Sequence, residues 1–363
     1  MPISRHLIRL PLLIATLTAH QGLRGQATMG VDEYQPRSTL RVAAHPVSRA
    51  RFPFVDVHGH QGGLRTAADI DALVVKMDAL NMRAMVNLSG GSGERLANLV
   101  RLTASHPGRF ITFANVDFSG VGEPGWTERT VTRFEADVRT GGAGGLKIFK
   151  NLGLDVKDAA GKRVTVDDPR LAALWEKAGE LGVPVLIHSG EPEPLFEPMD
   201  RFNERWLELK VHPGRARPPA RYPRFEEIMS EQRRMFRKHA HTTFIAAHLA
   251  WRGNDLAALG AMLDSLPNVM TEVAAVAHEL ARQPRNARAW MIRYQDRVML
   301  GKDTFNPEEY GAYFRIFETA DEYFDWIRPY AGGWKLYGLD LPDDVLRKLY
   351  WENAARTYRS LRQ

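Results

Sequence analysis

Two histidines one residue apart follow a short apolar stretch near the start of the chain, in PFVDVHGHQGG (53–63). Because side chains alternate along extended backbone, Asp56, His58 and His60 are expected on one face of a strand. Two facing imidazoles in a dry cavity repel each other when protonated and waste their lone pairs when neutral. A divalent cation removes both problems, since neutral histidine binds zinc and related metals. The pair therefore favours a metal site.

Three more candidate ligands follow apolar stretches later in the chain. His188 lies in VPVLIHSG, His248 in TTFIAAHLA and Asp303 in DRVMLGKD. Taken singly, His188 or His248 is better interpreted as a hydrogen-bonded core histidine. Together with the first pair, these residues give a nitrogen-rich donor set with one carboxylate. This combination is typical of a catalytic metal site.

Such a site needs a scaffold that brings the ends of distant strands together. From residue 53 onward, short apolar stretches alternate with amphipathic helices. The stretches are nearly continuous in apolar residues, as in parallel strands that are covered on both faces. Eight such units in about 310 residues predict an α/β fold, a closed (β/α)₈ TIM barrel, whose strand ends gather the catalytic groups. A doubly wound sheet is the alternative, but the first strand lacks the glycine-rich phosphate loop of that fold.

The clearest predicted helices have start and stop signals. The first begins at Thr66 and the other begins at Asp168–Pro169 and stops at Gly182. The first helix has one apolar stripe, formed by Ile70, Leu73, Val74, Met77 and Leu80.

The composition excludes several classes of protein. The 363 residues are 44% hydrophobic and 25% charged, with a formal net charge of +6. Acidic and basic residues are interspersed, without a basic run or an RNA-binding motif, so we expect no nucleic-acid partner. The absence of cysteine excludes disulfides, thiolate metal ligands and a cysteine nucleophile.

The N-terminal region has the features of a targeting segment. Residues 1–27 combine a basic start, an apolar core at 10–19 and small residues at the end, and are expected to be a signal peptide. The apolar core is too short to span a bilayer, and no other stretch qualifies as a membrane span. We therefore expect an exported protein, periplasmic or secreted, with a linker at 28–50 and one domain at 51–363. A cytoplasmic protein with a disordered leader is the alternative.

The strand-end residues resemble those of the amidohydrolase superfamily, in particular the amidohydrolase-related branch that includes aminocarboxymuconate-semialdehyde decarboxylase. The resemblance covers about residues 52–359 and rests on the first-strand H-x-H together with LIHSGEP, AAHLA, LGKDTF and WENAARTY. Lys302 departs from the pattern, because a small residue usually precedes the aspartate.

The resemblance implies a role for each residue. One divalent metal, Zn²⁺ or Mn²⁺, would be held by His58, His60, His188 and Asp303. Asp303 would also be catalytic, taking a proton from the metal-activated water. His248 would be the second catalytic residue, which polarises the substrate or the water, or else it would ligate a second metal.

These roles suit two reactions. The first is a metal-dependent hydrolase that opens an ester, lactone or amide through a metal-activated water. The alternative is a metal-dependent, non-oxidative decarboxylase (a carboxy-lyase) of an aromatic or unsaturated acid. The expected export favours hydrolysis. A metal-storing or ligand-binding barrel is the non-enzymatic alternative.

Three further residues are candidates for substrate binding. Lys147 binds the substrate or forms an internal ion pair, unless it carries a carboxylate that bridges two metals, as in binuclear members of the superfamily. Glu272 either orients a histidine or is a buried acid paired with a cation. Arg217 belongs to the proline-rich segment 190–224, which has many arginines and is long enough for an active-site lid. Such a lid would suit an anionic small-molecule substrate; a solvated loop is the alternative.

The region 305–340 contains Trp326, Trp334 and Tyr337. Barrels of the family often dimerise, so these residues either form the contact of a homodimer or cover the side of the barrel. The sequence leaves both interpretations open.

Overall fold

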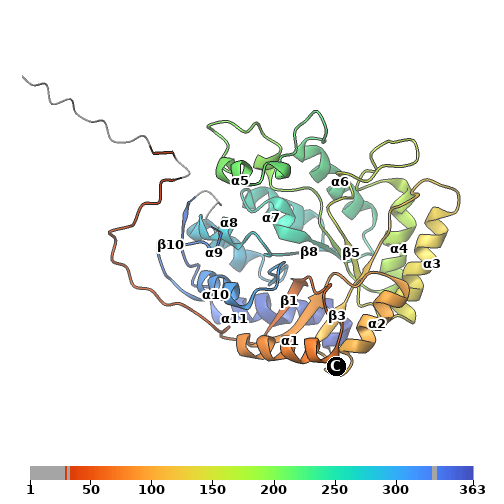
Figure 1. Ribbon diagram of the computed structural model, residues 1–363, viewed down its shortest axis with the longest axis horizontal. Helices are drawn as coiled ribbons and strands as arrows, with labels where there is room; N and C mark the ends of the chain where they lie inside the picture. The colour runs from red at the N-terminus through yellow and green to blue at the C-terminus, as the bar shows by residue number, and fades with distance from the viewer. Residues whose placement is uncertain (1–28, 31–32, 329–332, 363) are drawn as a thin grey trace, which may run out of the picture. The chain divides into compact units, whose positions relative to one another are not determined.

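The computed structural model describes residues 29–30, 33–328 and 333–362 (Figure 1). The chain divides into a first unit, Met1–Leu40, and a second unit, Arg41–Gln363. The expected signal peptide, residues 1–27, lies outside the described residues. No described helix has both the length and the apolar character needed to cross a membrane.

Parallel strands form the core of the second unit. Each strand pairs with the next one in chain order, except between β3 and β4. The strands are β1 (Phe54–Gly59), β2 (Met82–Asn87), β3 (Phe110–Thr112), β4 (Ala114–Asn115), β5 (Leu146–Ile148), β6 (Val185–Ile187), β7 (Phe244–Ala246), β8 (Val269–Glu272) and β9 (Val298–Met299).

β3 and β4 occupy one strand position. They are separated only by Phe113, whose N–H donates to the Asn87 carbonyl at 2.9 Å. The next residue, Ala114, donates to the Gly145 carbonyl at 2.9 Å. The backbone therefore continues the sheet from β2 to β5, and β1 to β9 make eight strand positions in the described chain.

Hydrogen bonds between the first and last strands close the ring. Val57 N–H donates to the Leu300 carbonyl at 2.9 Å, and Asp303 N–H donates to the His58 carbonyl at 2.7 Å. Gly59 and Asp303 also form a parallel bridge. The predicted (β/α)₈ TIM barrel is confirmed.

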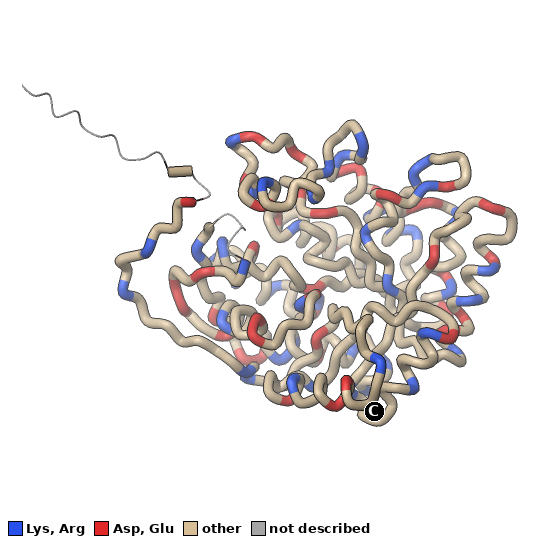
Figure 2. The backbone as a smooth tube through the Cα atoms, viewed as in Figure 1, with Lys and Arg blue, Asp and Glu red and all other residues tan. Residues whose placement is uncertain are grey.

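Helices surround the strands in the second unit (Figure 1). Figure 2 shows acidic and basic residues interspersed along the chain, as the sequence indicates. The helices are α1 (Ala67–Leu80), α2 (Gly93–Thr103), α3 (Trp126–Arg139), α4 (Ala172–Leu181), α5 (Trp206–Val211), α6 (Phe225–Lys238), α7 (Leu256–Ser265), α8 (Ala277–Ala281), α9 (Pro284–Arg293), α10 (Tyr310–Glu318), α11 (Asp343–Arg347) and α12 (Asn353–Thr357).

The predicted signals of the first helix and the stop at Gly182 are confirmed, whereas Asp168 and Pro169 begin a 3₁₀ turn (Pro169–Leu171) and α4 follows from Ala172. Thr66 caps α1 by accepting a hydrogen bond from Asp69 N–H, and the Asp69 carboxylate bonds back to Thr66 N–H. All five residues of the predicted stripe are buried. Gly182 ends α4 in the left-handed region, with φ of 63°, where glycine has no steric penalty.

Apolar residues form two layers. The larger layer lies between strands and helices and includes Phe54, Trp175 and Phe244. A second cluster, including Val55 and Val57, fills the inside of the barrel. The inside of the barrel is therefore packed with apolar side chains.

The side chains of β1 do not alternate regularly between the two faces as far as His58 and His60. The pairing of β1 with β2 shifts register between Asp56 and Gly59. Asp56 bonds to Tyr310 of α10, whereas His58 faces Glu272 at the end of β8. The expectation that Asp56 shares a face with the two histidines is therefore wrong, because the irregularity reverses the direction of the side chains.

Candidate metal centre

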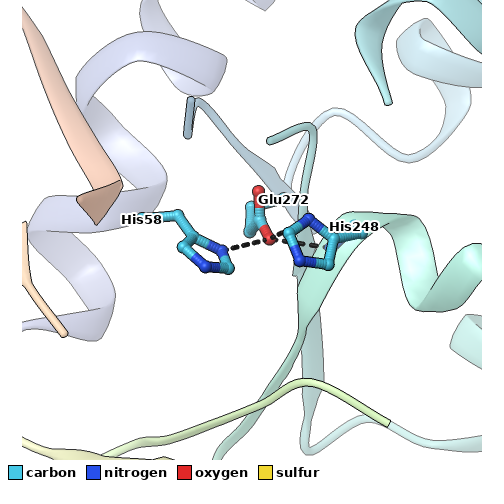
Figure 3. Close-up of side chains that lie close together, drawn as sticks. All are labelled: His58, His248 and Glu272. Atoms are coloured by element: carbon cyan, nitrogen blue, oxygen red, sulfur yellow. Dashed lines mark hydrogen bonds and ion pairs between the residues drawn. The ribbon is translucent and has the colours of Figure 1, made fainter. Parts of the chain in front are cut away.

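The strand ends bring distant polar residues together. His58 lies in β1, and Glu272 is the last residue of β8. His188 follows β6 directly, and His248 lies two residues after β7. Figure 3 shows three of these side chains, those of His58, His248 and Glu272, pointing toward one another from separate elements.

Three of the predicted ligands form one compact group. One donor atom each from His58, His60 and Asp303 lies within 4.8 Å of the others. Asp303 Oδ1 is 3.4 Å from His60 Nε2 and 3.7 Å from His58 Nε2. Burial alone would raise the pKa of Asp303, but the surrounding imidazoles hold it well below its usual range. Asp303 is therefore an anion at neutral pH, as a metal ligand must be.

Glu272 fixes the orientation of His58. Its Oε1 lies 2.9 Å from His58 Nδ1 and accepts the His248 N–H at 2.7 Å, while Oε2 accepts the Ala274 N–H. An ionised carboxylate only accepts, so Nδ1 of His58 carries the proton and Nε2 keeps its lone pair. Burial lowers the pKa of His58 well below its usual range, with a further contribution from Lys147. His58 is therefore a neutral imidazole that presents Nε2.

A second group of potential metal donors consists of His58, His248 and Glu272. The oxygens of Glu272 already accept three hydrogen bonds from the protein. Burial raises the pKa of Glu272, although His248 opposes this shift. These contacts match the orienting role among the alternatives for Glu272, which is fully buried and lies outside the cavity lining.

A chain of hydrogen bonds sets the tautomers of the two later histidines. His248 Nδ1 lies 2.8 Å from the Ala274 carbonyl, which only accepts, so Nδ1 carries the proton. The lone pair of His248 Nε2 then accepts from His188 Nδ1 at 3.2 Å. His188 Nε2 is left with a lone pair, buried and without a hydrogen-bond partner in the described part of the chain.

These donors fit a divalent cation. His58 and His188 both have pKa values lowered by burial, so they are neutral near pH 7. Neutral imidazoles whose Nε2 atoms carry lone pairs, together with one carboxylate, suit zinc or manganese. His188 lies outside the 4.8 Å group of His58, His60 and Asp303. It contacts His248, whose ring stacks on that of His58.

Lys147 points from β5 into the same centre. Its Nζ lies 3.3 Å from His58 Nε2, and its side chain is buried. Burial lowers the pKa of Lys147 to about 8, although the carboxylates of Asp303 and Glu272 raise it. Its ammonium therefore contacts the nitrogen that would bind a metal.

The backbone is strained where His248 is placed. The four residues from His248 to Trp251 all have positive φ, between 50° and 58°. Each left-handed residue costs roughly 1–2 kcal/mol when it is not glycine. Such strain is concentrated at functional sites, where the surrounding fold holds it.

A cavity of about 280 Å³ opens beside the centre. His188, His248 and Asp303 line it, together with residues from the predicted lid. The segment 190–224 is not structureless: it contains α5 and short 3₁₀ turns, and its Arg205 and Glu204 form ion pairs with Glu279 and Arg282. Its lining residues are Glu191, Pro192, Arg205, Glu208 and Arg215.

Arg217 lies outside the cavity lining. Its Nη2 donates to Glu191 Oε1 at 3.0 Å, and its Nη1 donates to backbone carbonyls of residues 214–216. Substrate binding by Arg217 remains a prediction, and in this arrangement Arg217 reaches the cavity only through Glu191.

Sequence reasoning missed several residues of the site. Ser89 Oγ lies 2.9 Å from His60 Nδ1. Ser89 ends the second predicted strand, so the expectation that polar residues at strand ends form the site (the strand-end rule) could have found it. Trp251, Tyr313 and Trp326 line the cavity. Trp326 stacks on His278, with ring centroids 5.4 Å apart. No local sequence signal places these aromatic residues.

The fold and the donor set define an enzyme of the metal-dependent TIM-barrel class. A family model described as Amidohydrolase matches residues 45–360. The chain therefore belongs to the amidohydrolase family, and the resemblance seen in the sequence is confirmed.

Solved structures share the fold at low sequence identity. A 2,6-dihydroxybenzoate decarboxylase complexed with 2,6-dihydroxybenzoate is 14% identical, with a TM-score of 0.55, over 85% of this chain and 99% of that one. A dihydroxybenzoic acid decarboxylase from Polaromonas sp. JS666, with bound manganese and 2-nitroresorcinol, is 13% identical, with a TM-score of 0.53, over 85% and 97%. An uncharacterized TIM-barrel protein from Bordetella bronchiseptica is 13% identical, with a TM-score of 0.54, over 85% and 99%. No curated protein sequence matches the chain.

Proposed function

We propose that this protein is a metal-dependent hydrolase that opens an ester, lactone or amide of a small substrate. The observation that carries the proposal is the convergence of donor atoms from His58, His60 and Asp303 within 4.8 Å, beside a cavity of about 280 Å³. The family supports the same class of chemistry. We propose one divalent metal, held by these three residues and His188.

The residues of the chain have distinct tasks in this reaction. When bound, a divalent cation lowers the pKa of water and polarises a carbonyl group. Asp303 accepts the proton of the attacking water, because its side chain is 36% exposed and borders the cavity. Glu272 keeps the proton of His58 on Nδ1, and Ala274 does the same for His248 through its carbonyl. The catalytic role predicted for His248 requires that its Nε2 be released from His188.

Asp303→Asn tests this assignment. The amide keeps the size of the side chain but cannot accept a proton, so kcat should fall by about 10²–10⁴-fold on any ester, lactone or amide that the enzyme hydrolyses. Asp340→Asn is a matched control, because Asp340 is also an aspartate with positive φ, and its side chain is largely exposed. Equal kcat values for the Asp303 variant and the wild type would reject the proposal.

Decarboxylation of an aromatic or unsaturated acid is the second candidate. It is supported by the similarity in fold to two dihydroxybenzoate decarboxylases. Metal-loaded protein should be incubated separately with a panel of lactones and esters and with 2,6-dihydroxybenzoate, in water enriched in ¹⁸O. Incorporation of ¹⁸O into the carboxylic acid formed from an ester or lactone identifies hydrolysis, whereas release of CO₂ identifies decarboxylation.

A further inference from the structure

Arg205 is a buried arginine of the segment 190–224 that contacts two acids. Its side chain is 8% exposed, its Nη1 donates to Glu208 Oε2 at 2.9 Å, and its Nη2 donates to Glu279 Oε1 at 2.6 Å. Glu208 belongs to the same segment, whereas Glu279 lies in α8. Since every residue of α8 is buried, Arg205 joins the segment to a well-packed part of the barrel.

This arginine lies in the middle of a larger network between the same two parts of the chain. Glu208 also accepts a hydrogen bond from Arg215, and Glu279 also accepts one from Arg282 Nη1 at 2.9 Å. Arg282 Nη2 donates in turn to Glu204 Oε2 at 2.9 Å. Three arginines and three glutamates therefore alternate, and two of their contacts link the segment to α8 and the residue that follows it.

The network forms part of the wall of the cavity beside the metal centre. Arg205, Glu208 and Arg215 line the cavity from the segment. Arg205 Nη2 also lies 3.4 Å from Nε2 of His278, which lines the cavity from α8 and stacks on Trp326. The position of Arg205 therefore affects two sides of the cavity.

Parts of the segment on either side of Arg205 are open to solvent. Phe202 is 79% exposed and Val211 is 58% exposed, although both side chains are apolar. A stretch with few buried apolar contacts opens locally at a lower free energy than the core does. A buried ion pair is costly to break, because one charge is left without its partner. The contacts of Arg205 should therefore control how often the segment opens.

We infer that the segment 190–224 is a gate of the catalytic cavity, and that the ion pair between Arg205 and Glu279 holds it closed. Opening breaks this pair, moves one wall of the cavity away from α8, and lets water, metal and substrate exchange with the strand ends. Arg205 is thus a positioning residue, since it acts through the wall and not on the reacting atoms. The inference rests on the proposed function for the identity of the centre that the gate controls.

Hydrogen–deuterium exchange of the metal-loaded protein, followed by mass spectrometry, tests the contact directly. Arg205→Met should raise the exchange rates of amides in residues 197–214 about tenfold or more, because two buried acids lose a shared cation. Arg205→Lys keeps the charge but replaces the two-armed donor with one ammonium group, so its rates should lie between those of Arg205→Met and wild type. Amides of α4 should exchange as in wild type in every variant, which shows that the barrel is intact.

The kinetics of metal exchange distinguish a gate from damage to the metal site. A gate changes the rates of entry and exit together, so Arg205→Met should take up zinc, and release it to a chelator, about tenfold faster than wild type. The dissociation constant should stay within about threefold of wild type, because the ligands are unchanged. A damaged site would instead raise the dissociation constant.

Two further variants make the result specific. Arg163→Met is a matched control, because Arg163 also joins two acids, Glu227 and Glu231 of α6, but lies outside the cavity lining. It should leave the exchange of residues 197–214 and both zinc rates unchanged. Glu279→Gln removes the same contact from the side of α8 and should reproduce the effects of Arg205→Met, so it also serves if that variant fails to fold.

Three outcomes would overturn the inference: exchange of residues 197–214 at the wild-type rate in Arg205→Met and Glu279→Gln, an equal effect of Arg163→Met, or faster zinc release with a proportional rise in the dissociation constant. These measurements need no turnover, so absence of hydrolysis would reject the proposed function alone. If wild-type protein takes up no metal, the metal centre is rejected, and hydrogen exchange by itself decides whether the gate exists.

Discussion

Nζ of Lys147 lies 3.3 Å from Nε2 of His58, inside the barrel and out of contact with solvent. The same nitrogen is the one that Glu272 leaves free for a metal by holding the proton on Nδ1. The lysine therefore contacts the lone pair of a proposed metal ligand. A cation at this centre must displace the lysine from His58.

Lys147→Met should change how the stability of the metal-free protein depends on pH. Burial lowers the pKa of Lys147 to about 8, below its usual 10.5. Between these values the unfolded chain still holds a proton that the folded chain has released, so the free energy of unfolding should rise with pH. The rise is at most about 3 kcal/mol, and urea unfolding from pH 7 to 10 would measure it.

The methionine variant should lose this rise, and Lys76→Met, at an exposed position of α1, should keep it. If both variants show the same pH dependence as wild type, Lys147 does not titrate between pH 7 and 10 in the folded protein. The prediction that its burial lowers its pKa would then be wrong.

Metal content tests the ligand set directly. Wild-type protein supplied with zinc or manganese should contain about one equivalent per chain by elemental analysis, and His58→Ala/His60→Ala should lose it. His106→Ala is the control, because His106 pairs with Asp71 away from the centre. About two equivalents would instead support Lys147 as a bridging ligand, and an unchanged metal content in the double variant would contradict the site.

Glu272→Gln should weaken metal binding without removing the site. The glutamine has one carbonyl oxygen for three donors, so the tautomer of His58 is no longer fixed. We expect the dissociation constant for zinc to rise about 10–100-fold in a competition assay with a chelator, with one equivalent still bound at saturation. Glu231→Gln is the control, since Glu231 is a buried acid that pairs with Arg163 elsewhere. Equal affinity in both variants would leave Glu272 without a positioning role.

The strand-end rule predicts the main parts of this centre because the geometry of a parallel barrel determines where the ends of its strands lie. His58, His60 and Asp303 come from the two ends of the domain, yet the closure between β1 and β9 places them together. The helices could be predicted for a similar reason, since the apolar stripe and the Thr66 cap of α1 are local signals.

Other features depend on tertiary contacts that no local pattern records. The register shift after Asp56 follows from the meeting of β1 with β2 and with α10. The tautomers of His188 and His248 depend on a carbonyl from another strand end. In the segment 190–224, Arg205 is buried and pairs with Glu279 of α8, 74 residues away. The sequence shows its charge but not its partner.

Asp56 has a structural role that the sequence did not indicate. Its Oδ1 accepts the N–H of His58 at 3.0 Å and that of Lys302 at 3.1 Å. Its Oδ2 accepts the hydroxyl of Tyr310 at 2.5 Å. Asp56 thus joins the two chain segments that carry the proposed metal ligands His58 and Asp303, and Tyr310 of α10 holds Asp56 in place.

Tyr310→Phe should therefore lower both stability and metal affinity. Loss of the hydroxyl leaves Oδ2 of Asp56 buried without a donor, which costs about 1–3 kcal/mol in the free energy of unfolding. Tyr294→Phe removes a similar hydroxyl from Asp264, whose carboxylate is half exposed and can bond to water instead, so its cost should stay below about 1 kcal/mol. Urea unfolding and zinc competition on both variants would measure these effects. Equal losses of stability, or an unchanged zinc affinity in Tyr310→Phe, would show that the contact with Asp56 does not hold the two ligand-bearing segments together.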